Sequence, residues 1–435
     1  MAQLHRRDNG ARIIEEDMLL EDILSKENAR AACKRVIQNK GCAGIDGMGI
    51  EELKPMLNET WAFLKAEILE GSYQPKPVKR VEIPKPGGGT RKLGIPTVLD
   101  RFIQQAISQL LTKRCDSKFS ESSYGYRPNR RAQGAVMQAQ KYLSEGYVHV
   151  VEIDIAKFFD AVQHDFLMHV LSEQIEDKRV LKLIRKYLQA GVQMGDIVKP
   201  NEQGTPQGGP ISPILSNILL DKLDKELEKR GHRFVRYADD ICIFVRSERA
   251  GKRVLESIGK FLKVKLKLTV NAEKSGVKRP HQAKLLGFKF SRSKDGAYEI
   301  RIHQESIETV KRKVREITNK NKPMKLENRI KGLNRLIAGW MNYFKIADGK
   351  WDLGSLDSWC RSKLRYCIWV TWKLVRTRIR ELKKLGMAHR DAVKCGCTRR
   401  GGWRVCHTFI LCTTLTNRYM REKVGYIGFE EVYLK

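Results

Sequence analysis

The chain has 435 residues, of which 83 are Lys or Arg and 50 are Asp or Glu, so its formal net charge is +33. This length suggests two to four domains of about 150 residues each. Apolar residues make up 41% and charged residues 31% of the sequence, a balance that excludes a wholly disordered chain. No run approaches the roughly 18 consecutive apolar residues that a membrane-spanning helix needs.

The N-terminus and the cysteines indicate an intracellular protein. Acidic residues interrupt the first apolar stretch, which therefore lacks the core of a secretory signal. The ten cysteines follow no regular spacing, which is typical of reduced thiols. We therefore expect a cytoplasmic protein with no membrane segment.

The large positive charge predicts a polyanionic partner. Lys and Arg side chains release condensed counterions when they meet phosphates, and nucleic acid is the commonest polyanion that a basic protein meets. A basic surface without a particular partner is the alternative.

The first hundred residues predict helices followed by a pair of strands. Apolar spacing indicates helices over residues 1–75, interrupted by a turn at Gly41–Gly47. Val78–Ile95 reads as two alternating strands joined by the glycine-rich turn Pro84–Gly89. A helix is expected over Asp100–Leu111.

Two later strands flank a long helix. Val148–Ile155 reads as one strand and Phe234–Val245 as a hairpin. Between them, Pro213–Arg230 predicts a helix with Ser212 as its N-cap. Beyond about Ile302, only helical periods remain.

Three aspartates stand at the ends of the apolar strands. Asp154 comes near the end of the first, and Asp239 and Asp240 occupy the turn of the hairpin. Carboxylates beside apolar strands are costly to bury unless a cation compensates them, and Mg²⁺ prefers such oxygen ligands. Two Mg²⁺ ions about 3.5–4 Å apart can drive an in-line displacement at phosphorus. The alternative for each acid taken alone is a solvated turn residue.

Several motifs resemble those of the group II intron-encoded reverse transcriptases, or maturases. Tyr237-Ala238-Asp239-Asp240 resembles the signature box of reverse transcriptases, and Asp154 with Phe158-Phe159-Asp160 resembles their first palm motif. The segments that resemble the intron-encoded branch, in the matching order, are Tyr124-Gly125-Tyr126-Arg127-Pro128, Gly204-Thr205-Pro206-Gln207-Gly208-Gly209-Pro210 and Leu286-Gly287-Phe288. The resemblance extends from about residue 23 to residue 292 and is weaker beyond.

The resemblance implies an α+β fold, a right-hand polymerase with fingers, palm and helical thumb and a small basic C-terminal domain. Residues 1–75 would form the N-terminal extension and the start of the fingers, and residues 76–300 the fingers and palm. Residues 301–375 would form the helical thumb, or maturase region, and residues 376–435 a basic DNA-binding domain.

The resemblance also implies the ligands of two Mg²⁺ ions, for which Mn²⁺ is a substitute. These are Asp154, Asp239 and Asp240, with the carbonyl of Ile155 as a further ligand. In this family the same three aspartates are catalytic.

Seven residues would surround the incoming nucleotide by the same resemblance. Lys85 and Arg91 would pair with the triphosphate, backbone amides of Lys157–Phe159 would hold phosphate oxygens, Gln207 would contact the nucleotide or template, and Lys274 would protonate pyrophosphate. Phe159 would clash with a 2′-hydroxyl and so select deoxynucleotides. We expect Phe158 and Phe159 to face opposite sides of a strand, with one of them buried. The ordinary alternatives are an exposed hairpin tip, tight turns and a solvent-facing lysine.

Template and primer contacts are expected at Arg101 and Arg127 and at the turn Leu286-Gly287-Phe288. A basic C-terminal run with nearby Trp372 and Trp403 predicts a nucleic-acid surface. Its members are Arg376, Arg378, Arg380, Arg399 and Arg400. A zinc site is the weaker alternative there, because the spacing of Cys395, Cys397, Cys406 and Cys412 misses the usual CxxC pattern.

The resemblance implies an RNA-directed DNA polymerase, a nucleotidyltransferase that extends a DNA primer on an RNA template with dNTPs. It further implies binding of the intron RNA, help with splicing and retrohoming by target-primed copying, in the bacterial cytoplasm or nucleoid. Many relatives carry an endonuclease domain, and we expect this chain to be of the type without one. A splicing-only maturase and a reverse transcriptase of a diversity-generating or defence system are the alternatives. Self-association as a homodimer is left open.

Overall fold

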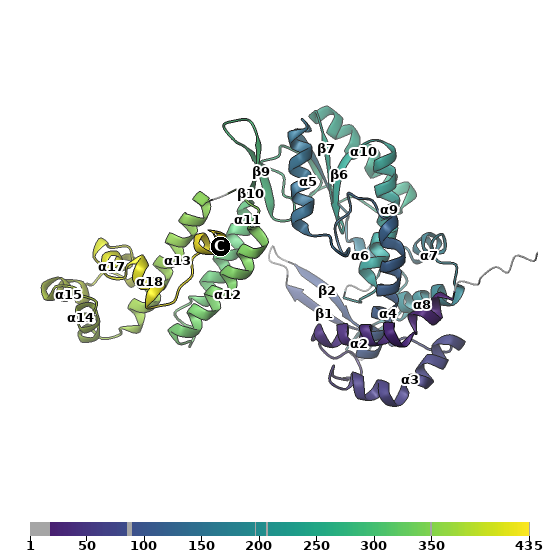
Figure 1. The fold of residues 1–435 in the computed structure, drawn as a ribbon, viewed down its shortest axis with the longest axis horizontal. Helices are drawn as coiled ribbons and strands as arrows, with labels where there is room; N and C mark the ends of the chain where they lie inside the picture. The colour runs from purple at the N-terminus through teal and green to yellow at the C-terminus, as the bar shows by residue number, and fades with distance from the viewer. Residues whose placement is uncertain (1–17, 85–88, 196, 206–207, 349, 435) are drawn as a thin grey trace, which may run out of the picture. The chain divides into compact units, whose positions relative to one another are not determined.

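The computed structural model describes residues 18–84, 89–195, 197–205, 208–348 and 350–434. These form two compact units (Figure 1). The first unit comprises residues 1–135 and 147–278, and the second comprises residues 136–146 and 279–435. Both units contain helices and strands, which agrees with the predicted α+β class.

The first unit begins with helices, as the apolar spacing predicted. Helix α4 is the one on which the others pack, and it starts where the side chain of Thr97 accepts a hydrogen bond from the amide of Asp100. Trp61 meets Phe102 of α4 edge to face, with ring centroids 5.5 Å apart. The bounds are α1 Leu19–Ile23, α2 Lys26–Gln38, α3 Leu53–Glu70 and α4 Val98–Cys115.

A four-stranded sheet follows these helices, in the order β2-β1-β4-β5. Strands β1 (Val78–Pro84) and β2 (Thr90–Ile95) are antiparallel, as the hairpin pattern predicted, with Val81 opposite Leu93. The short strands β4 (Val192–Met194) and β5 (Ile197–Lys199) complete the sheet. The tip of the first hairpin, including Lys85, lies outside the described residues.

A second four-stranded sheet, in the order β6-β7-β3-β8, carries the predicted acids. Its strands are antiparallel, and helices α9 and α10 pack against it. The structure starts α9 at Ser212 and makes Ile211 the N-cap, so Ser212 is the first helical residue and not the cap. The bounds are β3 His149–Asp154, β6 Arg233–Tyr237, β7 Asp240–Val245, β8 Gly276–Lys278, α9 Ser212–Lys229 and α10 Glu248–Lys265.

Shorter elements connect these layers. They are the 3-10 helix η1 (Asp116–Lys118), α6 (Phe158–Ala161), α7 (His164–Ser172) and α8 (Lys178–Gln189). Helix α5 (Ala132–Ser144) begins in the first unit, and its residues from Val136 onward belong to the second. Helices α1, α7 and α8 contact one another or the long helices of the first unit.

The second unit contains most of α5, a two-stranded sheet and the helices that follow this sheet. Strand β9 (Phe288–Arg292) pairs antiparallel with β10 (Tyr298–Ile302), and no described residue after Ile302 is in a strand. The last helix packs against α12 and α13, where Phe429 meets Trp340 edge to face. The helices are α11 Gln304–Ile317, α12 Leu326–Phe344, α13 Lys350–Thr371, α14 Val375–Lys384, α15 His389–Gly396, α16 Gly402–Val405, α17 Phe409–Thr414, α18 Asn417–Glu422 and α19 Phe429–Leu434.

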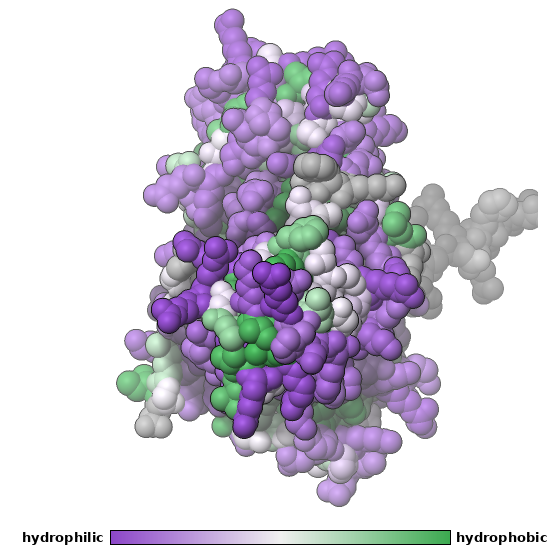
Figure 2. Space-filling model, turned by 90° about the vertical axis from the view of Figure 1, so that its left-hand side faces the viewer, coloured by the Kyte–Doolittle hydropathy of each residue, from purple (hydrophilic) through white to green (hydrophobic). Residues whose placement is uncertain are grey.

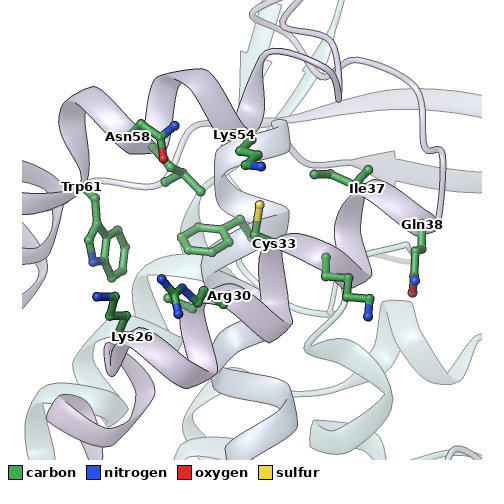
Figure 3. Close-up of a pocket in the computed structure, with 12 residues that line it drawn as sticks. Lys26, Arg30, Cys33, Ile37, Gln38, Lys54, Asn58 and Trp61 are labelled. Atoms are coloured by element: carbon green, nitrogen blue, oxygen red, sulfur yellow. The ribbon is translucent and has the colours of Figure 1, made fainter.

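The surface is polar over most of the face in Figure 2, with small apolar patches. A groove lies between α2 and α3, with Trp61 and Phe102 among its apolar lining and Lys26, Arg30 and Lys54 among its basic lining (Figure 3). None of the predicted site residues lines this groove. Within the described part of the chain, no helix combines the length and apolarity needed to cross a bilayer.

Candidate active site

The two central strands, β3 and β7, bring the predicted acids together at one end of the second sheet. Asp154 is the last residue of β3 and Asp240 the first of β7, and the antiparallel register places them directly opposite each other. Asp239 precedes Asp240 in the turn between β6 and β7. Acids that are far apart in the chain therefore become neighbours at the end of a sheet.

The backbone of Asp154 is anchored by the loop that contains Lys274, one of the predicted nucleotide contacts. The amide of Asp154 donates to the hydroxyl of Ser275 at 2.9 Å, and its carbonyl accepts from the amide of Asn271 at 2.8 Å. The neighbouring Ile155 pairs with Val270 and is buried. This loop therefore fixes the strand end from which the Asp154 carboxylate projects.

Lys274 belongs to the same loop and lies beside Asp154, where the sequence placed it near the nucleotide. Its Nζ is 3.9 Å from Asp154 Oδ2, and its side chain is 66% exposed. An ion pair this long and this exposed contributes little to stability, so Asp154 is free to exchange it for another cation.

The surroundings of Asp239 disfavour the negative charge of its carboxylate. Burial raises the pKa of its carboxyl, and the nearby charge of Asp154 raises it further, while Arg91 and Arg236 act in the opposite direction. Arg91, on β2, is therefore close enough to the acids to influence them. Burial and the charge of Asp239 also raise the pKa of Tyr126.

The donor set suits a hard cation. Carboxylate oxygens are what Mg²⁺ prefers, and Lys274 already brings one cationic group to Asp154. Among the described residues, no three His, Cys, Asp or Glu side chains are gathered tightly enough to hold a metal ion as they stand. Asp154, Asp239 and Asp240 are therefore not arranged as a preassembled metal centre in this structure.

The structure corrects the expected placement of Phe158 and Phe159. They begin the short helix α6 after β3 instead of continuing the strand, and both are buried, with ring centroids 5.1 Å apart. Lys157 makes this change of direction in a left-handed conformation, with φ of 47°, and its side chain is exposed. The alternation of a strand therefore does not apply, because the chain turns between Asp154 and Phe158.

The glycine-rich loop rests on the backbone of Phe159. The amide of Thr205 donates to the Phe159 carbonyl at 2.7 Å, and Gly204 has a φ of 89°. A Cβ atom on Gly204 would lie 2.8 Å from that carbonyl oxygen, so the loop approaches this closely only because the residue is glycine. Gln207, the predicted nucleotide contact of this loop, lies outside the described residues.

Arg127 has a structural role, and its predicted template contact stays a prediction. Its Nε donates to Asp116 Oδ1 at 2.8 Å, and its other donors reach the backbone carbonyls of Asp116, Ser120 and Ser123. Its side chain is only 3% exposed. A buried guanidinium whose donors are occupied in this way has little left for a template.

The side chain of Arg101 also binds a backbone carbonyl of the protein. Its Nη2 donates to the carbonyl of Cys42, and a Cβ atom on Gly41 would lie 2.1 Å from its Nη1. Arg101 therefore holds the turn that follows α2, and its predicted template contact remains a prediction.

The turn Leu286-Gly287-Phe288 lies in the second unit, on α11 and α12. Tyr343 donates to the Leu286 carbonyl at 2.9 Å, and Ser306 donates to the Gly287 carbonyl at 3.0 Å. Phe288 is fully buried against Tyr343 and Phe344, so its ring cannot touch a primer as the sequence predicted. The half-buried Leu286 and the backbone of Gly287 remain candidates for that contact.

The C-terminal arginines divide into exposed and structural members. Arg376, Arg399 and Arg400 are exposed, as is Arg380, which pairs with Glu381 at 2.9 Å. Arg378 instead lies over the ring of Trp369 at 4.8 Å and donates to the carbonyl of Trp372. A basic hollow on α14 and α15 is lined by Arg376, Ile379, Arg380, Lys383, Lys384 and His389.

Two of the C-terminal thiols, those of Cys395 and Cys406, lie in surroundings that favour the protonated form. Burial raises the pKa of Cys406 to about 12 and also raises the pKa of Cys395. Zinc binds the thiolate, and protonated thiols are poor ligands for it.

The motifs missed Arg236 and Asn217, two fully buried polar residues beside the acidic turn. An arginine inside the apolar run Phe234-Val235-Arg236-Tyr237 was the available signal. A buried charge at such a position is stable only when it is paired, and Arg236 is paired with Asp224 and Asn217.

Comparison with known proteins agrees with this geometry. Residues 83–290 match the family Reverse transcriptase (RNA-dependent DNA polymerase), and residues 307–386 match Group II intron, maturase-specific domain. The first match includes the sheet with the three aspartates and the second includes α12. These matches identify a reverse transcriptase domain, which belongs to a family of RNA-dependent DNA polymerases.

Curated relatives identify the branch. Protein YkfC of Escherichia coli (strain K12) is 31% identical over 303 residues, which cover 60% of this chain and 79% of that protein. Group II intron-encoded protein LtrA of Lactococcus lactis subsp. cremoris is 34% identical over 202 residues, which cover 45% of this chain but 32% of LtrA. The chain belongs to the group II intron-encoded reverse transcriptases, with a reverse transcriptase domain and a maturase domain.

Among solved structures, a partial Cas6-RT-Cas1–Cas2 complex is 26% identical. The match covers 57% of this chain and 42% of that chain, with a TM-score of 0.36.

Proposed function

We propose that the three aspartates at the end of the β3–β7 strand pair are the catalytic centre for extending a DNA primer on an RNA template with dNTPs. Asp154, Asp239 and Asp240 would hold two Mg²⁺ ions, or Mn²⁺ in their place, with the Ile155 carbonyl as a further ligand. Bound there, the ions would activate the primer 3′-hydroxyl and stabilise the leaving oxygen of pyrophosphate. The observation that carries this proposal is the direct pairing of Asp154 with Asp240.

The surrounding residues would bind and select the nucleotide. The influence of Arg91 on Asp239 supports a place for Arg91 beside the triphosphate. Lys274, beside Asp154, would donate a proton to departing pyrophosphate, and the backbone at Lys157–Phe159 would hold phosphate oxygens. The Phe159 ring would exclude a 2′-hydroxyl. Lys85 and Gln207 keep their predicted roles, although both lie outside the described residues.

The partner would be the group II intron RNA, which the protein would bind, help to splice and copy into DNA at a target site. The net charge of +33 supports such a polyanionic partner. The exposed arginines of α14 and of the segment after α15 would contact the DNA target. The ten cysteines show no disulfide among the described residues, which favours a reducing compartment such as the cytoplasm.

A primer-extension assay with RNA template, DNA primer, dNTPs and Mg²⁺ tests the catalytic assignment. Asp239→Ala combined with Asp240→Ala is expected to lower extension at least 1000-fold, on the order of the loss of a central catalytic group. Affinity for intron RNA should change less than threefold, because these acids do not attract phosphates without metal ions.

Glu51→Ala with Glu52→Ala is the matched control, since it removes two adjacent exposed acids from the same unit. This variant should extend the primer like wild type. Extension by the Asp239/Asp240 variant at the wild-type rate would reject the site. A wild-type protein that binds intron RNA yet never extends a primer would favour the splicing-only alternative.

A further inference from the structure

Arg236 is a fully buried cation three residues before Asp239. It lies in β6 between apolar neighbours, and its relative exposure is 0%. Removing a guanidinium from water costs several kcal/mol, a cost met only when its donors are paired with good geometry. Its partners therefore show what this charge does.

On one side, Arg236 is clamped to α9. Its Nε lies 2.8 Å and 3.0 Å from the two carboxylate oxygens of Asp224, which is itself fully buried, and its Nη2 donates to the same carboxylate. Its Nη1 donates to Asn217 Oδ1 at 3.0 Å. The guanidinium thus has a fixed position and orientation.

On the other side, Arg236 reaches the acidic turn itself. The same Nη1 donates to the carbonyl of Ala238 at 3.1 Å. Ala238 has a φ of 57°, a left-handed conformation that costs a non-glycine residue energy and persists only when its surroundings impose it. The bond from Arg236 is one such constraint on the residue just before Asp239.

A second constraint comes from Gly125 and runs through the same asparagine. Asn217 Nδ2 donates to the Gly125 carbonyl at 2.9 Å. A Cβ atom on Gly125 would lie 2.2 Å from the Ala238 amide nitrogen, so the backbone at Gly125 packs directly against the acidic turn. Asn217 therefore couples Arg236 and Gly125, the two groups that confine Ala238.

We propose that Arg236, held by Asp224 and Asn217, is a positioning residue that sets the place of the Ala238–Asp239 turn relative to Asp154, and thereby the affinity of the site for divalent ions. This inference rests on the proposed function of the three aspartates. The ordinary alternative is that the buried ion pair serves the stability of the fold alone. The positioning role predicts that weakening the Arg236–Asp224 pair changes metal binding in protein that remains folded. The stability role predicts that it does not.

The test compares Arg236→Lys, which keeps the charge but not the two-pronged geometry, with Asn217→Ala, which removes the coupling without leaving an unpaired charge. Asp177→Asn is the control. Asp177 is a buried carboxylate of the same unit, paired with Arg179 at 3.0 Å and with the Leu20 amide, and neither partner contacts the turn.

Three quantities are measured for each full-length variant bound to primer–template. They are the Mg²⁺ concentration for half-maximal extension, the dissociation constant of Mn²⁺ from electron paramagnetic resonance titration, and the midpoint of thermal unfolding. We expect Arg236→Lys to raise the first two about tenfold and Asn217→Ala about threefold. Excess metal should restore part of the extension rate, and template affinity should stay within twofold of wild type.

Asp177→Asn should lower the unfolding midpoint while both metal constants stay within twofold of wild type. Metal constants within twofold of wild type in folded Arg236→Lys or Asn217→Ala would overturn the positioning role. If Arg236→Lys does not fold, Asn217→Ala decides alone. If Asp239→Ala with Asp240→Ala still extends primers, the proposed function fails. If that variant is inactive but the metal constants above do not move, only the positioning inference fails.

Discussion

At the scale of single residues, the fold disfavours the ionised form of Asp239, which is the form that metal binding would require. Burial and the charge of Asp154 raise the pKa of its carboxyl, so the fold favours the protonated form. An acid whose pKa is raised by folding supports stability while it is protonated. That support is lost as the pH rises through the folded-state pKa. At a pH above this folded-state pKa and without metal, the ionised Asp239 therefore destabilises the protein.

Asp239→Asn should therefore make the metal-free protein more stable than wild type at a pH above this pKa. The advantage should shrink as the pH falls toward the range where Asp239 takes up its proton, because both proteins are then neutral at this position. Adding Mg²⁺ should stabilise wild type more than the variant. Urea unfolding at several pH values, with and without Mg²⁺, measures these differences. A stability difference that does not vary with pH would contradict the argument.

At the scale of elements, Arg127 ties η1 to the loop that follows it. It bonds to Asp116 at the start of η1 and to Ser120 and Ser123, and its guanidinium lies 5.5 Å from the centre of the Phe119 ring. The neighbouring strand β6 is bonded to the same loop through Arg236 and Ser122. Arg127 thus supports the backbone segment that adjoins the acidic turn.

Arg127→Ala should lower the free energy of unfolding by about 2–4 kcal/mol, because it leaves a partly buried carboxylate and buried carbonyls unpaired. Template affinity of the folded variant should not change. The control is Arg130→Ala, whose partner Glu121 is largely exposed, and it should cost less than about 1 kcal/mol. A variant with normal stability and weakened template binding would restore the template contact that the sequence suggested.

At the scale of the whole molecule, the C-terminal end of the chain, at α19, shares a core with α13. Asp357 of α13 accepts hydrogen bonds from Tyr426 and from the amides of Phe429 and Glu430, and Phe429 is fully buried. Removing residues 376–435 would therefore expose the core of the second unit. Substitutions on the surface are the proper test of nucleic-acid binding there.

Arg376→Gln, Arg380→Gln and Lys383→Gln together should lower the slope of log affinity against log salt for duplex DNA by up to about 2.7, at about 0.9 for each phosphate that the protein no longer neutralises. Extension of a preformed primer–template should change much less. Arg253→Gln, Lys260→Gln and Lys263→Gln remove the same charge from the exposed side of α10 and serve as the control. Equal changes of slope in both variants would show that total charge, and not this surface, governs DNA binding.

Sequence patterns alone placed three aspartates at strand ends, located α9 and the strands β1, β2, β3, β6 and β7, and indicated the family of the chain. These features depend on local patterns: apolar periodicity, glycine turns and short motifs such as Tyr237-Ala238-Asp239-Asp240. That Asp154 faces Asp240 became visible in the folded chain alone, because the pairing of strands so far apart in the sequence has no local signature. The tertiary structure also decided that Arg127, Arg236 and Phe288 are buried, since burial depends on what the rest of the chain packs around a residue.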